Sequence, residues 1–166
     1  DWTIAAKEEY SAYIQGGNYV ISKKTESGSW FFYKSIYTEY DKDYSIEVEA
    51  TQTSGVENNG YGLVFAAKDV DNSHYFMVTS NGYYRISGYE NGKYTPTTDW
   101  TKTDKVSGMD EVNSLKVERK GDKLYFSINN NVVHTLPSKD IKVHGNRIGF
   151  VLNDEMRVEF DFLEVK

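Results

Sequence analysis

The chain has 166 residues, a length typical of one domain with a sizeable hydrophobic core. Its net charge of -6 argues against nucleic acid or an anionic membrane surface as a partner, and no apolar run approaches the roughly 18 residues that a membrane span needs. The absence of cysteine excludes disulfides and thiolate metal sites.

Hydrophobic and polar residues alternate along most of the chain, which is the pattern of half-buried β-strands. The alternation is clearest at 44–51 and recurs at 61–67, 115–117, 124–128 and 148–152. Turn-forming residues such as the Asn-Gly pairs at 81–82 and 91–92 separate these runs. We expect a single domain over residues 1–166 with eleven or twelve antiparallel strands, each covered on one face, in two stacked sheets.

Aromatic residues are concentrated between positions 83 and 100. A sugar-binding surface needs flat apolar rings for the C–H face of the sugar and polar groups for its hydroxyls. The predicted carbohydrate-binding residues are Tyr83, Tyr89, Asn91, Tyr94 and Trp100. The alternative is that these rings pack inward, because aromatic residues are common in strands for structural reasons.

The segment NNGYGLVFAAKDVDNSHYFMVTSNGYYRISGYENGKYTPTTDW (58–100) resembles bacterial domains of the concanavalin A-like lectin/glucanase superfamily, including laminin G-like and sugar-hydrolase domains. Segments 113–136, 147–152 and 158–165 resemble the later strands of those domains. The resemblance implies a two-sheet antiparallel jelly-roll β-sandwich. It leaves function open, because the superfamily includes lectins, glycosidases, carbohydrate-binding modules and adhesive domains.

The segment EFDFLE (159–164) resembles the E-x-D-x-x-E signature of laminarinase-type retaining glucanases. That resemblance implies Glu159 as nucleophile, Glu164 as acid/base and Asp161 as the residue that tunes the nucleophile. Strict alternation would turn Glu164 into the core, so we expect a β-bulge at Phe162–Leu163 that points Glu164 outward. The alternative is an ordinary closing strand, since the superfamily's last strand commonly has an F-D-x-F-x-V pattern.

Two segments are candidates for metal binding. Asp69, Asp71 and Ser73 have the spacing that opens a calcium loop, but His74 stands where an EF-hand needs Gly, so we expect a capped turn. Jelly-roll relatives often hold a structural Ca²⁺ between an early loop and the last strand. The resemblance therefore implies Asp161 as a candidate calcium ligand, and no other cofactor is expected.

The preferred functional prediction is a non-catalytic carbohydrate-binding or adhesive module that binds a polysaccharide or oligosaccharide. The resemblance implies an extracytoplasmic bacterial protein, in which a signal peptide would precede the domain and further domains could flank it. Two alternatives stay open: a glycoside hydrolase that uses Glu159, Asp161 and Glu164, and a protein-interaction module that binds no sugar.

Overall fold

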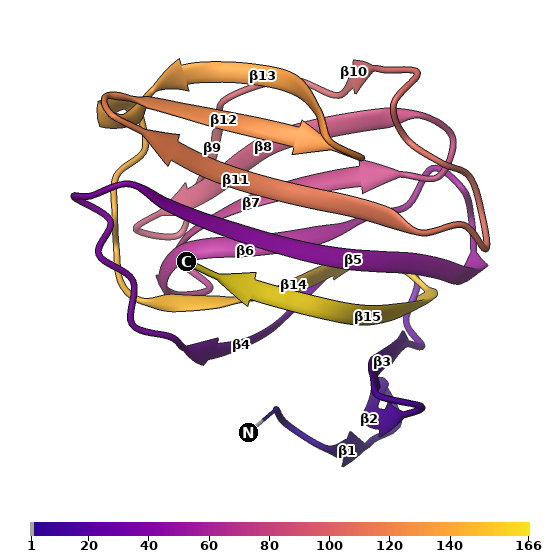
Figure 1. Ribbon diagram of the computed structural model, residues 1–166. Coiled ribbons are helices and arrows are strands. Elements are labelled where there is room, and N and C mark those ends of the chain that lie inside the picture. Colours follow the sequence, from indigo (N-terminus) through magenta and orange to yellow (C-terminus); the bar gives the residue numbers. More distant parts are fainter. Residues whose placement is uncertain (1) are drawn as a thin grey trace.

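The computed structural model describes residues 2–166 as two antiparallel β-sheets packed face to face (Figure 1). The eight-stranded sheet has the order β1 (Ala5–Ala6), β2 (Tyr10–Gln15), β3 (Asn18–Lys23), β15 (Met156–Val165), β5 (Tyr44–Gly55), β11 (Asn113–Lys120), β12 (Lys123–Ile128) and β13 (Asn131–Pro137). The seven-stranded sheet has the order β10 (Thr101–Lys102), β8 (Tyr83–Glu90), β7 (Asn72–Thr79), β6 (Gly60–Asp69), β14 (Arg147–Asn153) and β4 (Ser29–Ser35), with β9 (Lys93–Pro96) also paired to β8. One turn of 3-10 helix, η1 (Ser138–Asp140), follows β13.

This arrangement confirms the predicted all-β jelly-roll sandwich. The strands number fifteen within residues 2–166, more than the eleven or twelve expected, because β1, β9 and β10 are short pieces of two to four residues at the sheet edges. Strands this short carry too few alternating residues to be recognised from a pattern of period two.

The main core lies between the two sheets and follows the predicted alternation. In β5, Tyr44, Ile46, Val48 and Ala50 are buried while the residues between them are partly exposed. The rings of Phe150 in β14 and Phe160 in β15 stack with centroids 4.0 Å apart and so join the sheets at the centre. Burying each such side chain contributes roughly 1.5–3 kcal/mol to stability.

Strands β6 and β7 depart from the prediction that each strand has one covered face. Eight consecutive residues of β6, from Gly60 to Ala67, and seven of β7, from Ser73 to Thr79, are buried. A strand that is buried on both faces has a nearly continuous apolar sequence, as LVFAA and YFMV have here. The outer face of the seven-stranded sheet is therefore covered by further side chains, and these form the candidate site described below.

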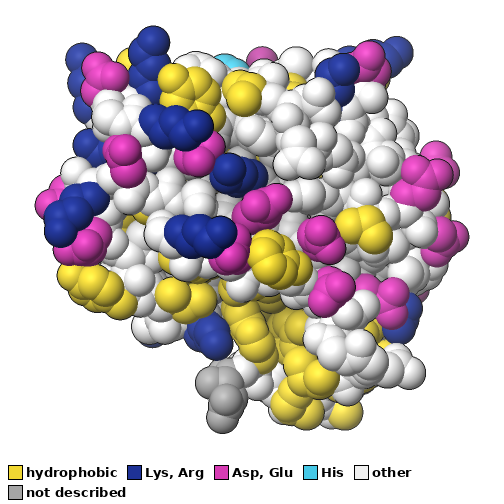
Figure 2. All heavy atoms as spheres, viewed as in Figure 1, with side chains coloured by type: hydrophobic (Ala, Val, Ile, Leu, Met, Phe, Trp, Pro, Cys, Tyr) yellow, Lys and Arg dark blue, Asp and Glu magenta, His cyan; other side chains and the backbone are white. Residues whose placement is uncertain are grey.

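The outer face of the eight-stranded sheet is polar by contrast. Figure 2, viewed with this sheet in front, shows basic and acidic side chains interspersed over its upper and middle parts, with hydrophobic side chains gathered toward the bottom of the view. Lys116 and Lys120 both pair with Glu118, at 3.2 and 3.5 Å. Among residues 2–166 there is no helix with the length and hydropathy required to cross a membrane.

Candidate functional site

The outer face of the seven-stranded sheet carries a layer of aromatic rings and guanidinium groups, which we call the aromatic layer. Its members are Phe31, Tyr33, Tyr75, Arg85, Tyr89, Tyr94, Trp100 and Arg147. Ring centroids lie 5.9 Å apart from Phe31 to Tyr75, 6.2 Å from Tyr75 to Tyr89 and 5.8 Å from Tyr89 to Tyr94. Tyr75 is almost fully buried within this layer, and burial raises its pKa to about 12, so the phenol is neutral at physiological pH.

The alternation of β8 and the tight hairpin to β9 position the central part of the aromatic layer. Arg85 and Tyr89 point outward because Tyr84 and Ile86, the residues of opposite parity, are buried in the main core. Asn91 and Gly92 form the turn with φ values of 50° and 75°, as their sequence predicts. The hairpin places Tyr94 directly opposite Tyr89 in the register.

The segment after β9 carries Trp100 over the sheet. The backbone N–H groups of Thr97 and Thr98 both donate to the carbonyl oxygen of Ile86 at 2.9 Å, and the N–H of Ile86 donates to the Thr98 hydroxyl at 3.0 Å. The indole then lies above Gly60, where a Cβ would approach the Trp100 Cη2 atom to 2.9 Å. Glycine at this position therefore leaves the space that the indole occupies.

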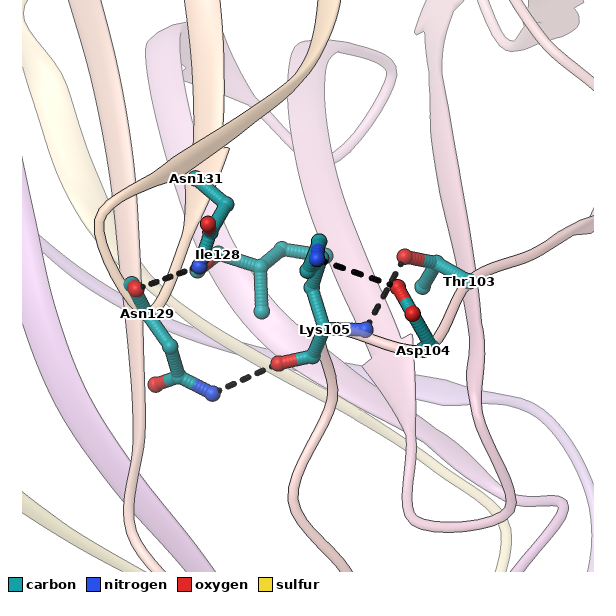
Figure 3. Close-up of polar contacts among 6 residues, drawn as sticks. All are labelled: Thr103, Asp104, Lys105, Ile128, Asn129 and Asn131. Atoms are coloured by element: carbon teal, nitrogen blue, oxygen red, sulfur yellow. Dashed lines mark hydrogen bonds and ion pairs between the residues drawn. The ribbon is translucent and has the colours of Figure 1, made fainter.

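Polar contacts fix the chain that follows Trp100 to the neighbouring sheet, as Figure 3 shows. The Asn129 side chain donates to the carbonyl oxygen of Lys105 at 2.8 Å, and the Asn131 side chain donates to the carbonyl oxygen of Asn129 at 2.7 Å. Asn129 and Asn130 have φ values of 49° and 66°, the left-handed conformation that asparagine tolerates better than most residues. These contacts tie the Trp100 segment to the turn between β12 and β13.

Arg85 lies at the centre of the aromatic layer. Its guanidinium carbon is 4.5 Å from the Trp100 ring centroid and 5.5 Å from that of Tyr94, distances typical of cation–π contacts. The buried Nε atom of Arg85 and the buried hydroxyl of Ser87, two residues along the same strand face, have no hydrogen-bond partner. Buried polar atoms without partners are rare in proteins and are commonly explained by a bound water.

A hollow of about 380 Å³ opens beside Trp100 at the end of the layer. Its lining consists of Asn58, Thr79, Asn81, Tyr83 and Trp100. The Thr79 hydroxyl donates to the Asn81 side-chain oxygen at 2.6 Å and accepts from the Tyr83 backbone N–H at 3.1 Å, which fixes the polar wall. Two aromatic walls and two asparagine side chains match the mixture of flat apolar and polar groups that a sugar ring requires.

The structure brings four of the five predicted sugar-binding residues onto this one face. Tyr83 and Trp100 line the hollow, while Tyr89 and Tyr94 pack edge to face at the far end of the hairpin. Asn91 lies in the hairpin turn, where its backbone N–H donates to Asn72. Sequence reasoning did not include Arg85 and the rings of β4 and β7 among the site residues, although the unbroken apolar run of β7 could have indicated a covered outer face.

Comparisons with known proteins extend this picture at the level of fold. No protein-family model and no curated protein sequence matches the chain. Among solved structures, a family 66 carbohydrate-binding module from Bacillus subtilis is 17% identical, with all of this chain and 91% of that chain covered and a TM-score of 0.61. The Emp47p carbohydrate recognition domain is 14% identical over 98% of this chain and 90% of that one, with a TM-score of 0.63.

The chain has the concanavalin A-like jelly-roll fold. An enzyme shares it: the family 7 alginate lyase A1-II' is 6% identical over 98% of this chain and 84% of that one, with a TM-score of 0.61. Since binding proteins and an enzyme have the same fold, the fold alone does not assign an activity.

The predicted catalytic carboxylates lie on β15, in the other sheet of the jelly roll. A β-bulge is present as expected, but at Asp161–Phe162 and so one residue earlier than predicted: the register with β5 passes from Phe160 opposite Ala50 to Leu163 opposite Val48. Glu159 is paired with Thr51 and Glu164 with Glu47, so the two glutamates lie four positions apart along β5. At roughly 3.3 Å per residue this is ~13 Å between backbone positions.

Ion pairs hold the two glutamates in opposite directions along the strand. The carboxylate of Glu159 pairs with Arg157 at 3.2 Å, and that of Glu164 pairs with Lys166 at 2.9 Å, each partner lying on the side away from the other glutamate. A retaining glycosidase needs its carboxyl groups about 5–5.5 Å apart. These ion pairs do not favour the catalytic assignment, which stays a prediction, and Asp161 between the two glutamates is exposed.

The structure places the candidate calcium ligand Asp161 in the exposed bulge of β15. Within residues 2–166 no group of three or more His, Cys, Asp or Glu side chains is arranged to share a metal ion. In the early loop after β3, the oxygen atoms contact a lysine ammonium group. The buried Lys23 donates to the carbonyl oxygens of Thr25 and Ser27 at 2.5 and 3.0 Å. The calcium prediction stays a prediction, which thermal unfolding with and without Ca²⁺ can test.

A larger hollow of about 680 Å³ lies at the opposite end of the sandwich, where β5 begins. Arg119 is one of the residues that line this hollow. Its guanidinium group donates to the backbone carbonyl oxygens of Tyr40 and Gly121. The Tyr40 hydroxyl accepts a hydrogen bond from the Ala66 N–H at 3.0 Å. Because the Arg119 guanidinium has protein partners while that of Arg85 has none in the described part of the chain and lies against two aromatic rings, we take the aromatic layer and not the larger hollow as the candidate site.

Proposed function

We propose that this protein is a carbohydrate-binding module whose ligand lies against the aromatic layer. The observation that carries the proposal is the hollow beside Trp100, where an aromatic ring forms one wall and asparagine, threonine and tyrosine form the others. Stacking of a sugar ring on an indole uses the C–H face of the sugar. The polar side chains of the hollow can donate hydrogen bonds to the sugar hydroxyls or accept hydrogen bonds from them.

The similar structures support the same proposal, since one is a carbohydrate-binding module and another a carbohydrate recognition domain. We also propose that the module is non-catalytic and acts in an extracytoplasmic, adhesive setting. The ion pairs of Glu159 with Arg157 and of Glu164 with Lys166 support the non-catalytic part of this proposal. A polysaccharide or oligosaccharide is the proposed partner.

Tryptophan fluorescence offers a direct test. Trp2 and Trp30 pack against the main core, so Trp100 is the tryptophan that a ligand on the aromatic layer would contact. Titration with a panel of soluble oligosaccharides should shift or quench the emission saturably for at least one of them. Affinities of the variants are measured by calorimetry, because Trp100→Ala removes the fluorescent reporter. Trp100→Ala and Tyr83→Ala should weaken binding about tenfold, which corresponds to ~1.4 kcal/mol.

The matched control is Tyr125→Ala, which removes a partly exposed ring from the outer face of the eight-stranded sheet. It should bind like the wild type. A flat response to the whole panel, or equal binding by all three variants, would contradict the proposal. A stable protein complex that sugars do not compete away would then favour the protein-interaction alternative.

A further inference from the structure

The four arginines of the chain fall into two pairs that differ in what their side chains contact. Arg119 and Arg157 donate to oxygen atoms of the protein, and Arg157 pairs with Glu159 at 3.2 Å. Within residues 2–166, the side chains of Arg85 and Arg147 form no hydrogen bond or ion pair and contact aromatic rings instead. The unpaired guanidinium groups both belong to the aromatic layer.

The aromatic layer also differs from the rest of the surface in its charge. The whole chain has 25 acidic and 19 basic residues, yet the outward-facing positions of β4, β14, β7 and β8 contain no Asp or Glu. Their only charged residues are Arg147 and Arg85. Strand β6, between β7 and β14, ends at Asp69, whose carboxylate accepts hydrogen bonds from the Asp71 N–H and the Asn72 side chain. The part of the face around Arg85 therefore presents positive charge on a protein whose net charge is -6. A charge without a counterion on an otherwise acidic molecule favours an anionic ligand.

Stacking holds the Arg85 guanidinium in a defined orientation. The Trp100 ring lies 4.5 Å from its carbon atom, and a stacked guanidinium keeps the hydrogen-bond donors at its edge available in the plane of the group. Its Nε atom is buried, so the donors that a ligand can reach are those of the two terminal nitrogens, which have no partner among residues 2–166. A carboxylate is the group whose two oxygens match this planar arrangement of donors.

Given the proposed function, we propose that the ligand is an acidic glycan that contains uronic acid residues, and that Arg85 binds the uronate carboxylate. Trp100 supplies the stacking surface for the sugar ring while the guanidinium beside it pairs with the carboxylate. Arg147, stacked 4.8 Å from the Tyr33 ring centroid, lies on the same face and can attract a second acidic residue of the same chain. Arg85 is thus a specificity-determining residue of the proposed site.

The test compares oligogalacturonates with methyl-esterified oligogalacturonates of the same length, because the pair differs only in the carboxylate charge. Binding is measured by calorimetry on the intact domain at low salt and again at high salt. We expect the acid to bind at least tenfold more tightly than the ester and to lose affinity at high salt. Arg85→Gln should remove the preference, whereas Arg85→Lys should restore part of it, because lysine keeps the charge without the planar donors.

Lys139→Gln is the control, since it removes one positive charge from an exposed residue of η1 that lies outside the aromatic layer. It should keep the preference of the wild type. If acid and ester bind equally, and Trp100→Ala weakens both, the inference is wrong while the proposed sugar-binding function stands. If neither these ligands nor a neutral oligosaccharide panel binds, both are wrong.

Discussion

The indole of Trp100 lies directly over Gly60, so that a methyl group on Gly60 would come within 2.9 Å of the ring. Gly60→Ala should displace the indole, because the end of a side chain yields more easily than a strand backbone. We expect a changed tryptophan emission, about tenfold weaker sugar binding and a stability loss of roughly 1 kcal/mol. Spectra and affinities identical to those of the wild type would contradict the placement of Trp100 over the sheet.

Lys23 is 1% exposed, and its ammonium group donates three hydrogen bonds to Thr25 and Ser27. Lys23→Met should lower the free energy of unfolding by roughly 2–4 kcal/mol, because the loop carbonyl oxygens lose a charged donor. Chemical denaturation measures this loss. The exposed neighbour Lys24 provides the control, and Lys24→Met should change stability by less than about 0.5 kcal/mol. Equal losses in both variants would show that the ammonium group contributes nothing particular.

The stability of the domain should decrease in mildly acidic solution. Burial lowers the pKa of His74 below its ordinary value of 6.5, and the His74 Nε2 atom lies 2.7 Å from the carbonyl oxygen of Lys142. As the pH falls below about 6.5, His74 therefore takes up a proton in the unfolded chain before it does so in the folded one. The contribution is fully present above about pH 6.5 and is lost as the pH falls through the lower pKa of the folded state.

The pKa values of His134 and His144 are lowered as well, also chiefly by burial, so their contributions have the same sign. Denaturation with urea at several pH values between about 5 and 8 measures the slope. His74→Gln should flatten it, because glutamine can still donate to the Lys142 carbonyl and does not titrate. A stability that stays constant over this range in the wild type would be the contrary result.

The alternative of a glycoside hydrolase has its own test. Because the carboxylates of Glu159 and Glu164 pair with Arg157 and Lys166, we expect the wild type to release no reducing sugar from a panel of glucans. Glu159→Gln should bind sugars like the wild type. Reducing-sugar release that Glu159→Gln abolishes would establish catalysis and overturn the non-catalytic proposal.

The elements that sequence reasoning predicted well are those in which a single face is buried. The alternation of β5 predicted its inward residues, and the cost of burying Glu164 predicted the bulge in β15. The burial of β6 and β7 on both faces was missed. The prediction assumed that each strand has one covered face, and under that assumption the outward-facing Tyr75 would be exposed. The position of Trp100 depends on hydrogen bonds between Ile86 and a loop, which no periodicity records.

The place of β15 in the eight-stranded sheet has a consequence for biosynthesis. Every other strand precedes β15 in the chain, yet β15 lies between β3 and β5 and pairs with both. Until the ribosome has released it, β3 and β5 expose unpaired edges that can pair with other chains. Such non-local pairing also slows folding. The domain is therefore expected to complete its folding only after translation of β15, and nascent chains that stall earlier are candidates for chaperone binding and aggregation.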